Sequence, residues 1–159
     1  IIFLILKNKY FMKVIVNKIM LAVAAVLAFA SCVKSEDSII KELAGDWYYE
    51  TVEADTPVQV YVSFAKDMTF ELYQKVGDGA FRKYTGTYTF DGTLLDGVYS
   101  DKAPWKEAKS VTIDGDSLTV VGVKTGETIT YVRKLVPATV RYHYSDALKS
   151  MPVSAEPWL

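Results

Sequence analysis

The chain has 159 residues, of which 50% are hydrophobic, 23% charged and 13% aromatic. Such a chain is expected to build one well-packed domain, which excludes the disordered, collagen-like and disulfide-scaffold classes. Residues 1–31 contain four lysines and no acidic residue, which leaves 14 basic and 19 acidic residues in the rest of the chain. This acidic remainder lacks the basic patch that nucleic-acid binding requires.

The N-terminal segment has the pattern of a secretory signal. An uncharged apolar stretch of 13 residues separates Lys18 from Cys32. Lysines before a short apolar run are typical of a signal peptide, and the run is too short for a permanent membrane-spanning helix. We therefore predict a signal peptide over residues 1–31. Met12 followed by Lys13 would begin a signal peptide of ordinary length. We therefore interpret residues 1–11 either as sequence translated from upstream of the true start or as a variable extension.

Cys32 ends a motif, Phe29-Ala30-Ser31-Cys32, that resembles a bacterial lipobox. Cys32 is the only cysteine of the sequence, so a disulfide within the chain is impossible. We expect Cys32 to carry lipid and residues 32–37 to form a tether. Three acyl chains would hold the protein on a membrane far more firmly than one. The expected location is the cell envelope, at the outer membrane, either periplasmic or surface-exposed; a soluble secreted protein with an incidental cysteine is the alternative.

The apolar period predicts one short helix and then a series of strands. Apolar residues at 39, 40 and 43 predict a helix over 38–43, and Gly45 is the residue expected to terminate it. Beyond Gly45 the period changes to two, which is typical of strands. We predict eight strands, over residues 46–53, 58–64, 69–75, 81–90, 94–100, 108–113, 118–123 and 128–133.

The connections between these strands are short and rich in turn residues, as in Asp91-Gly92 and Thr125-Gly126. Short connections favour antiparallel pairing of neighbours, since parallel crossovers need about a dozen residues or more. No helical period follows Gly45 until Pro137, so nothing is available to cover a flat sheet. The predicted fold is therefore all-β: an eight-stranded antiparallel up-and-down barrel over residues 38–136. Residues 137–159 are predicted to be a C-terminal extension that packs on the barrel, with a helix over 144–151.

Alternation along the strands predicts the side chains that face the interior. An eight-stranded barrel has room for its own side chains or for one small ligand. The predicted inward residues are Trp47, Tyr49, Val58, Val60, Val62, Phe64, Phe70, Leu72, Tyr84, Tyr88, Phe90, Leu95, Tyr99, Val111, Ile113, Leu118, Val120, Ile129 and Tyr131. From this set we take as candidate ligand-binding residues Trp47, Tyr49, Val60, Val62, Phe70, Leu72, Tyr88, Tyr99 and Tyr131.

Three motifs together resemble the bacterial lipocalin-like lipoproteins, which belong to the calycin group of barrels. Gly45-Asp46-Trp47 is similar to the Gly-x-Trp that opens those barrels. Thr130-Tyr131-Val132-Arg133 supplies the arginine that in this group lies across that tryptophan. Residues 97–105, which end in Ala103-Pro104-Trp105, resemble the middle strand and loop of the family. The resemblance covers about residues 43–134 and implies a lipocalin-like barrel with Gly45, Trp47 and Arg133 as its structural signature.

Two non-catalytic functions remain open. In the first, the barrel holds a small apolar or amphipathic molecule. In the second, the barrel interior is filled by its own side chains, and exposed aromatic residues recognise a glycan or a protein. The candidates for the second function are Tyr61, Tyr73 and Trp105. The sequence has no zinc-ligand set, nucleophile elbow or phosphate loop, so we predict no enzyme activity, metal or cofactor. The single histidine, His143, is predicted to be a surface or packing residue.

Overall fold

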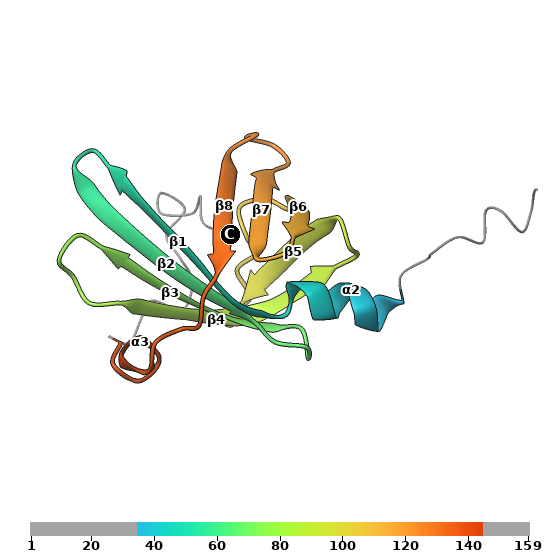
Figure 1. The fold of residues 1–159 in the computed structure, drawn as a ribbon, viewed down its shortest axis with the longest axis horizontal. Coiled ribbons are helices and arrows are strands. Elements are labelled where there is room, and N and C mark those ends of the chain that lie inside the picture. The colour runs from blue at the N-terminus through green and yellow to red at the C-terminus, as the bar shows by residue number, and fades with distance from the viewer. Residues whose placement is uncertain (1–34, 145–159) are drawn as a thin grey trace, which may run out of the picture. The chain divides into compact units, whose positions relative to one another are not determined.

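The computed structural model describes residues 35–144 and shows a closed barrel with two short helices (Figure 1). Helix α2 (Glu36–Leu43) precedes the barrel and helix α3 (Ala138–Tyr142) follows it. Each strand pairs antiparallel with its neighbour in the chain, and β1 also pairs with β8. The predicted all-β, eight-stranded up-and-down barrel is confirmed. Its strands are β1 (Gly45–Glu53), β2 (Thr56–Phe64), β3 (Thr69–Val76), β4 (Arg82–Phe90), β5 (Leu94–Tyr99), β6 (Lys109–Asp114), β7 (Ser117–Gly122) and β8 (Thr128–Arg133).

Several predicted features lie outside the described residues: the signal peptide, Cys32 and the helix expected over 144–151 beyond its first residue. By its internal contacts the chain divides into Ile1–Ser35 and Glu36–Leu159. The second unit contains all eight strands and both described clusters of buried hydrophobic residues. Because its pairings and its core are internal, we expect a chain that starts at Glu36 to fold by itself.

The strand connections of an up-and-down barrel alternate between its two ends. One end carries α2 and the connections at 65–68, 91–93 and 115–116, and we call it the helix end. The other end carries the connections at 54–55, 77–81, 100–108 and 123–127, and we call it the hairpin end. Three of the four hairpin-end connections have at most five residues, whereas the β5–β6 connection has nine.

Helix α2 packs against the helix end through its apolar stripe. Ile40 and Leu43 are buried, and Leu43 belongs to the same cluster as the barrel interior. The amide of Ala44 donates to the Ile40 carbonyl at 2.8 Å and continues the helical bonding, after which Gly45 turns the chain into β1 with a φ of 126°. This left-handed conformation favours glycine, because it has no Cβ.

The interior is one continuous cluster of buried side chains. All predicted inward residues belong to it; Tyr49 and Ile113 are only partly buried. The prediction from period-two alternation is confirmed, because successive side chains of a strand point to opposite faces of a sheet. Leu43 from α2 and Trp105 from the β5–β6 connection join this cluster.

The pairing between β5 and β6 is short and irregular. The two strands pair at Leu94 with Ser110 and at Leu95 with Lys109. Farther along, an isolated bridge joins Val98 to Pro104. Between these two points the β6 side holds two more residues than the β5 side, as in a β-bulge. Because the shift is an even number of residues, the side chains of residues 104–108 continue the inward and outward alternation of β6.

Candidate functional site

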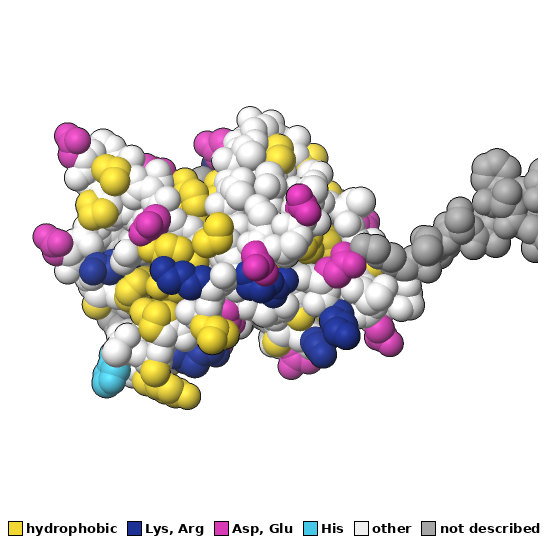
Figure 2. All heavy atoms as spheres, in the orientation of Figure 1, with side chains coloured by type: hydrophobic (Ala, Val, Ile, Leu, Met, Phe, Trp, Pro, Cys, Tyr) yellow, Lys and Arg dark blue, Asp and Glu magenta, His cyan; other side chains and the backbone are white. Residues whose placement is uncertain are grey.

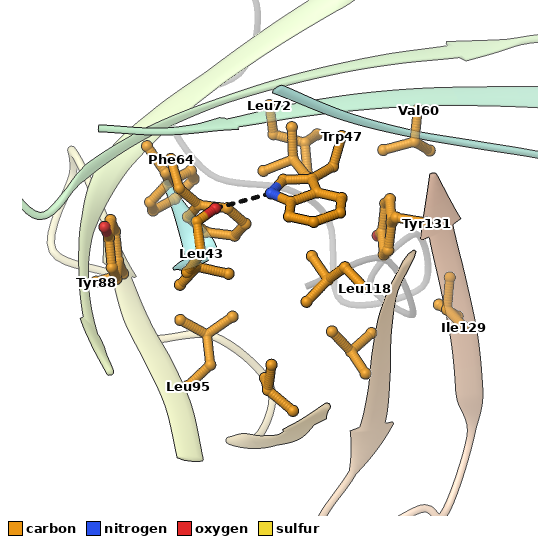
Figure 3. Packing of buried hydrophobic residues seen from close by; sticks show 14 of the residues in the cluster. Leu43, Trp47, Val60, Phe64, Leu72, Tyr88, Leu95, Leu118, Ile129 and Tyr131 are labelled. Carbon is orange, nitrogen blue, oxygen red and sulfur yellow. Dashed lines mark hydrogen bonds between the residues drawn. The ribbon is translucent and has the colours of Figure 1, made fainter. Parts of the chain in front are cut away.

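The helix end of the barrel is closed by Trp47 and Arg133, which lie on paired residues of β1 and β8. The guanidinium carbon of Arg133 lies 4.0 Å from the centre of the Trp47 ring. The indole nitrogen of Trp47 donates to the Leu43 carbonyl at 2.8 Å (Figure 3). Arg133 also donates to the carbonyls of Glu42 at 2.9 Å and Ala44 at 3.1 Å. These bonds tie the first strand, the last strand and α2 together.

Gly45 makes this arrangement sterically possible. A Cβ at this position would lie 2.6 Å from a guanidinium nitrogen of Arg133, and the backbone already has a positive φ. The structure therefore brings together the three predicted signature residues, Gly45, Trp47 and Arg133. Their contacts are with one another and with the backbone of α2 and its C-terminal end, which makes their role architectural.

The predicted ligand-binding residues line a common interior. Figure 3 shows side chains from strands on several sides of the barrel, together with Leu43 from α2, pointing toward one centre. Trp47, Val60, Leu72 and Tyr131 are fully buried. Tyr49 is half-buried and its ring lies 5.7 Å from that of Tyr131. The whole predicted set lies in one apolar and aromatic wall: Trp47, Tyr49, Val60, Val62, Phe70, Leu72, Tyr88, Tyr99 and Tyr131.

Two inward-facing glycines, Gly86 and Gly97, make room for larger side chains. A Cβ at Gly86 would lie 2.7 Å from the Phe70 ring, and one at Gly97 would lie 2.4 Å from Trp105. Close contacts of this kind need a residue without a Cβ. Phe70 and Trp105 in turn contact each other edge to face, with ring centres 5.3 Å apart. The wall beside β4 and β5 is therefore formed by side chains that lie flat over glycines.

Sequence reasoning missed three inward residues at the hairpin end, namely Trp105, Glu107 and Lys109. All three are buried, with 4%, 3% and 2% of their surface exposed. Their spacing continues the period-two alternation of β6, in which Val111 is also buried. That alternation was the signal that could have found them. It was masked by Pro104 and by the charges at 106, 107 and 109, which favour a loop.

Glu107 connects two loops of the hairpin end. Its carboxylate accepts hydrogen bonds from the Thr125 hydroxyl at 2.6 Å and from the amides of Lys124 and Thr125 at 2.5 and 3.1 Å. Its carboxylate also lies on the inner face of Gly122, where a Cβ would be 2.4 Å away. The Thr125 hydroxyl bond, followed by the backbone bonds and the charge of Lys109, lowers the pKa of Glu107 to about 2. Glu107 is therefore a charged anchor between the β5–β6 and β7–β8 connections.

Several interior tyrosines are held neutral. Burial raises the pKa of Tyr88 to about 12, and its hydroxyl donates to the Ala65 carbonyl at 2.7 Å. Burial also raises the pKa of Tyr131, which is fully enclosed. For Tyr84 the burial that raises its pKa outweighs the opposing charge and hydrogen bond of Arg82. Each of these hydroxyls is therefore neutral at ordinary pH.

The residues expected to form an exposed recognition surface are buried. Tyr61, Tyr73 and Trp105 expose 6%, 0% and 4% of their surface, so the expectation of exposed aromatic rings is wrong. Trp105 is buried because it continues the inward alternation of β6 and packs over Gly97. Tyr61 and Tyr73 do point outward from β2 and β3, but they lie in a second buried cluster with Tyr48, Val136 and Val140.

The cover over this outer face comes from the segment after β8. Val136 and Val140 pack on the tyrosines, and Arg141 forms ion pairs with Asp46 at 3.1 Å and Glu71 at 3.3 Å. Glu71 also accepts hydrogen bonds from Lys83 and from Tyr73. Figure 2 shows hydrophobic and basic side chains interleaved on one face of the molecule, over β1, β3 and α3. The outer face of β2 and β3 is therefore covered by the chain's own segment after β8.

The described part of the chain offers no group of three or more His, Cys, Asp or Glu residues that could hold a metal. His143 is exposed and follows α3. Among helices between residues 35 and 144, none has the length and apolar character needed to cross a bilayer.

A family model described as "Lipocalin-like domain" matches residues 43–120. No curated protein matches the sequence. Among solved structures, the chain is similar to a protein from Bacteroides uniformis ATCC 8492 determined by NMR, with 18% identity and a TM-score of 0.46 over 59% of this chain and 90% of that one. Lipocalin-like domains generally bind ligands rather than catalyse reactions. The family match confirms the resemblance seen in the sequence over residues 43–120.

Proposed function

We propose that this protein is a lipid-anchored envelope protein whose barrel holds one small apolar or amphipathic molecule without chemically changing it. The observation that carries the proposal is the continuous apolar and aromatic inner wall, to which all eight strands contribute. Binding sites for small molecules are typically lined in this way, with a few polar groups that fix orientation.

The two ends of the barrel support an entry route at the hairpin end. At the helix end, Trp47, Arg133 and Leu43 pack together and are bonded through the backbone of α2. At the hairpin end the strands are joined by loops alone, without a helix. The side chains of Val52, Val76 and Val123 are more than half exposed there. Under the proposal, an apolar ligand enters the barrel past these exposed apolar residues.

The alternative function, recognition of a glycan or protein through Tyr61, Tyr73 and Trp105, loses its support because these rings are buried. For the membrane anchor, the support is the sequence around Cys32, where an apolar run and two small residues precede the cysteine. Under the proposal the lipid on Cys32 keeps the barrel at the outer membrane.

Ligand binding is tested by native mass spectrometry of the unit Glu36–Leu159, purified from the organism that makes it. The expected result is a non-covalent adduct of a few hundred daltons that is lost on denaturation. A bare mass under gentle conditions, together with no uptake of an added apolar dye, would contradict the proposal.

The anchor is tested separately in the full chain. Replacing Cys32→Ser removes the thiol that would receive lipid, so the protein should move from the membrane fraction to the soluble fraction. Ser31→Ala is the matched control, because it keeps a small residue before the cysteine and should remain with the membrane. Retention of the Cys32→Ser variant in the membrane fraction would contradict the anchor and leave the barrel's ligand binding untouched.

A further inference from the structure

The first and last strands of the barrel are joined over only a small part of their length. β1 pairs with β2 from Gly45 to Glu53, whereas it pairs with β8 at only Trp47 and Tyr48. Figure 1 shows β1 and β8 diverging from this closure toward the hairpin end. Within residues 35–144, the edge of β1 at Glu50–Glu53 that is turned away from β2 therefore has no strand beside it. We call this region the β1–β8 seam.

The other short pairing of the barrel, between β5 and β6, is bridged by the chain itself. Beyond the paired residues, the Trp105 amide donates to the Gly97 carbonyl at 2.9 Å, and the Tyr99 amide donates to the Ala103 carbonyl at 2.8 Å. In the part of the chain that the structure describes, no backbone bond of this kind crosses from Glu50–Glu53 to β8. The β1–β8 seam is therefore left open where the β5–β6 pairing is bridged.

Both sides of the β1–β8 seam present strand edges. An unpaired edge offers a row of amide donors and carbonyl acceptors to another extended backbone. Alternate residues of Glu50–Glu53 direct these groups away from β2, as the antiparallel hydrogen-bond pattern requires. Residues 128–130 of β8 likewise pair with β7 on one side and have no described strand on the other. An extended peptide that adds a strand here satisfies backbone groups on an edge that no described strand covers.

The side chains along the seam indicate the character of such a peptide. Residues 49–55 and 127–131 contain four acidic residues and no basic residue. All four acidic residues are exposed: Glu50, Glu53, Asp55 and Glu127. On the inner side, Ile129 is buried in the apolar cluster and Tyr49 packs against that cluster. Because the side chains of a strand alternate between its two faces, the seam favours a peptide in which basic and apolar residues alternate.

We propose that the β1–β8 seam binds an extended segment of a partner protein, which adds a strand along β1 and alternates basic with apolar residues. This interaction uses the backbone edge of the barrel and goes beyond the binding of a small molecule in its interior. The acidic residues disfavour a second copy of this chain as the partner, because two copies would bring like charges together at the seam. A basic segment complements the same charges.

Binding is tested with the unit Glu36–Leu159 and a synthetic peptide, fluorescein-Lys-Val-Lys-Val-Lys-Val-amide, followed by fluorescence anisotropy. A control peptide with the same side chains and N-methylated backbone amides cannot donate to a strand edge, so it should bind about tenfold or more weakly. Glu53→Lys should weaken binding of the first peptide about fivefold. Asp78→Lys makes the same change of charge at an exposed position of the β3–β4 connection and should bind like the unmodified protein.

Hydrogen exchange shows where the peptide binds. In the protein alone, alternate amides of Glu50–Glu53 should exchange rapidly. At a peptide concentration of about ten times its dissociation constant, these amides should exchange about tenfold more slowly. The amide of Gly115, in the turn between β6 and β7 at the helix end, should be unaffected.

Three results would overturn the proposal. The first is no binding of the unmethylated peptide, or equal binding of the two peptides. The second is binding that leaves the amides of Glu50–Glu53 unprotected. The third is slow exchange of all these amides before peptide is added, which would show that another occupant, the C-terminal residues of the chain or a second copy, already covers the edge. None of these results bears on the binding of a small molecule in the interior.

Discussion

Arg133 lies across the face of Trp47, with its guanidinium carbon 4.0 Å from the ring centre, although 86 positions separate the two residues in the sequence. The contact joins the last strand to the first at the point where the barrel closes. The same guanidinium donates to two carbonyls at the C-terminal end of α2. One side chain therefore holds the closure of the sheet and the position of the helix at once.

Replacing Arg133→Met should destabilise the barrel by about 1–3 kcal/mol, because it removes a cation–π contact and two hydrogen bonds to backbone carbonyls. Urea unfolding followed by tryptophan fluorescence measures the loss. Lys66→Met, in an exposed turn, is the control and should change the stability by less than about 0.5 kcal/mol. Equal stabilities of the two variants would contradict the structural role of Arg133.

The contact between Gly97 and Trp105 predicts a non-additive pair of substitutions. Gly97→Ala would place a Cβ 2.4 Å from the indole and should cost about 1–3 kcal/mol through overpacking. In a chain that already carries Trp105→Ala, the same substitution should cost much less, because the ring is gone. A double-mutant cycle measures this coupling. An equal cost in both backgrounds would show that the ring does not lie over the glycine.

Glu107 predicts a loss of stability in acid. The folded protein lowers the pKa of Glu107 from the ordinary glutamate value of 4.5 to about 2. The anchor therefore stabilises the fold above the higher value, and this stabilisation is lost as the pH falls toward the lower one. Glu107→Gln cannot ionise and lacks this dependence. Urea unfolding at several pH values should show the gap between the two proteins narrowing across that window. A gap that is constant from neutral to acidic pH would contradict the charged anchor.

The β1–β2 hairpin contains a strain that can be relieved. Ala54 and Asp55 have φ values of 45° and 64°, in the left-handed region that favours glycine. Asp55→Gly should therefore stabilise the protein by about 0.5–1 kcal/mol, measured as a higher urea midpoint. Asp78→Gly, in the neighbouring β3–β4 connection, is the control, since Asp78 does not have a positive φ and gains nothing from the change. A lower midpoint for Asp55→Gly would contradict this reading of the turn.

The same hairpin shows where local sequence rules succeed and where they fail. The strands were predictable because their alternation is regular and most of their turns contain glycine or aspartate. The strand β2 begins at Thr56 rather than at the predicted 58, because the turn uses Ala54 and Asp55 and a proline follows. This turn has no glycine and β2 begins with Thr56-Pro57, so the local pattern places the strand start too late, and only the pairing of the two strands reveals it.

The candidate site was predictable on the regular strands and unpredictable where distant segments meet. The inward positions follow from alternation alone. The burial of Tyr73 depends on Arg141 pairing with Glu71, 70 positions away, and on Val140 packing on the outer face. Trp105 continues the alternation of β6, but Pro104 and the charges that follow it hide that pattern, and only the pairing of β5 with β6 shows that the segment faces the interior. The packing on Tyr73 leaves no periodic pattern in the sequence, so it required the fold.

The central claim, that the barrel interior is the binding site, is tested most directly by a matched pair of bulky substitutions on β8. Ile129→Trp adds volume to the interior, whereas Thr130→Trp adds the same ring to the exposed face of the adjacent position. Circular dichroism confirms that both fold, and titration with N-phenylnaphthylamine measures their affinities. The account predicts that Ile129→Trp loses about tenfold or more in affinity while Thr130→Trp binds like the unmodified protein. Undiminished binding by a folded Ile129→Trp variant would contradict it.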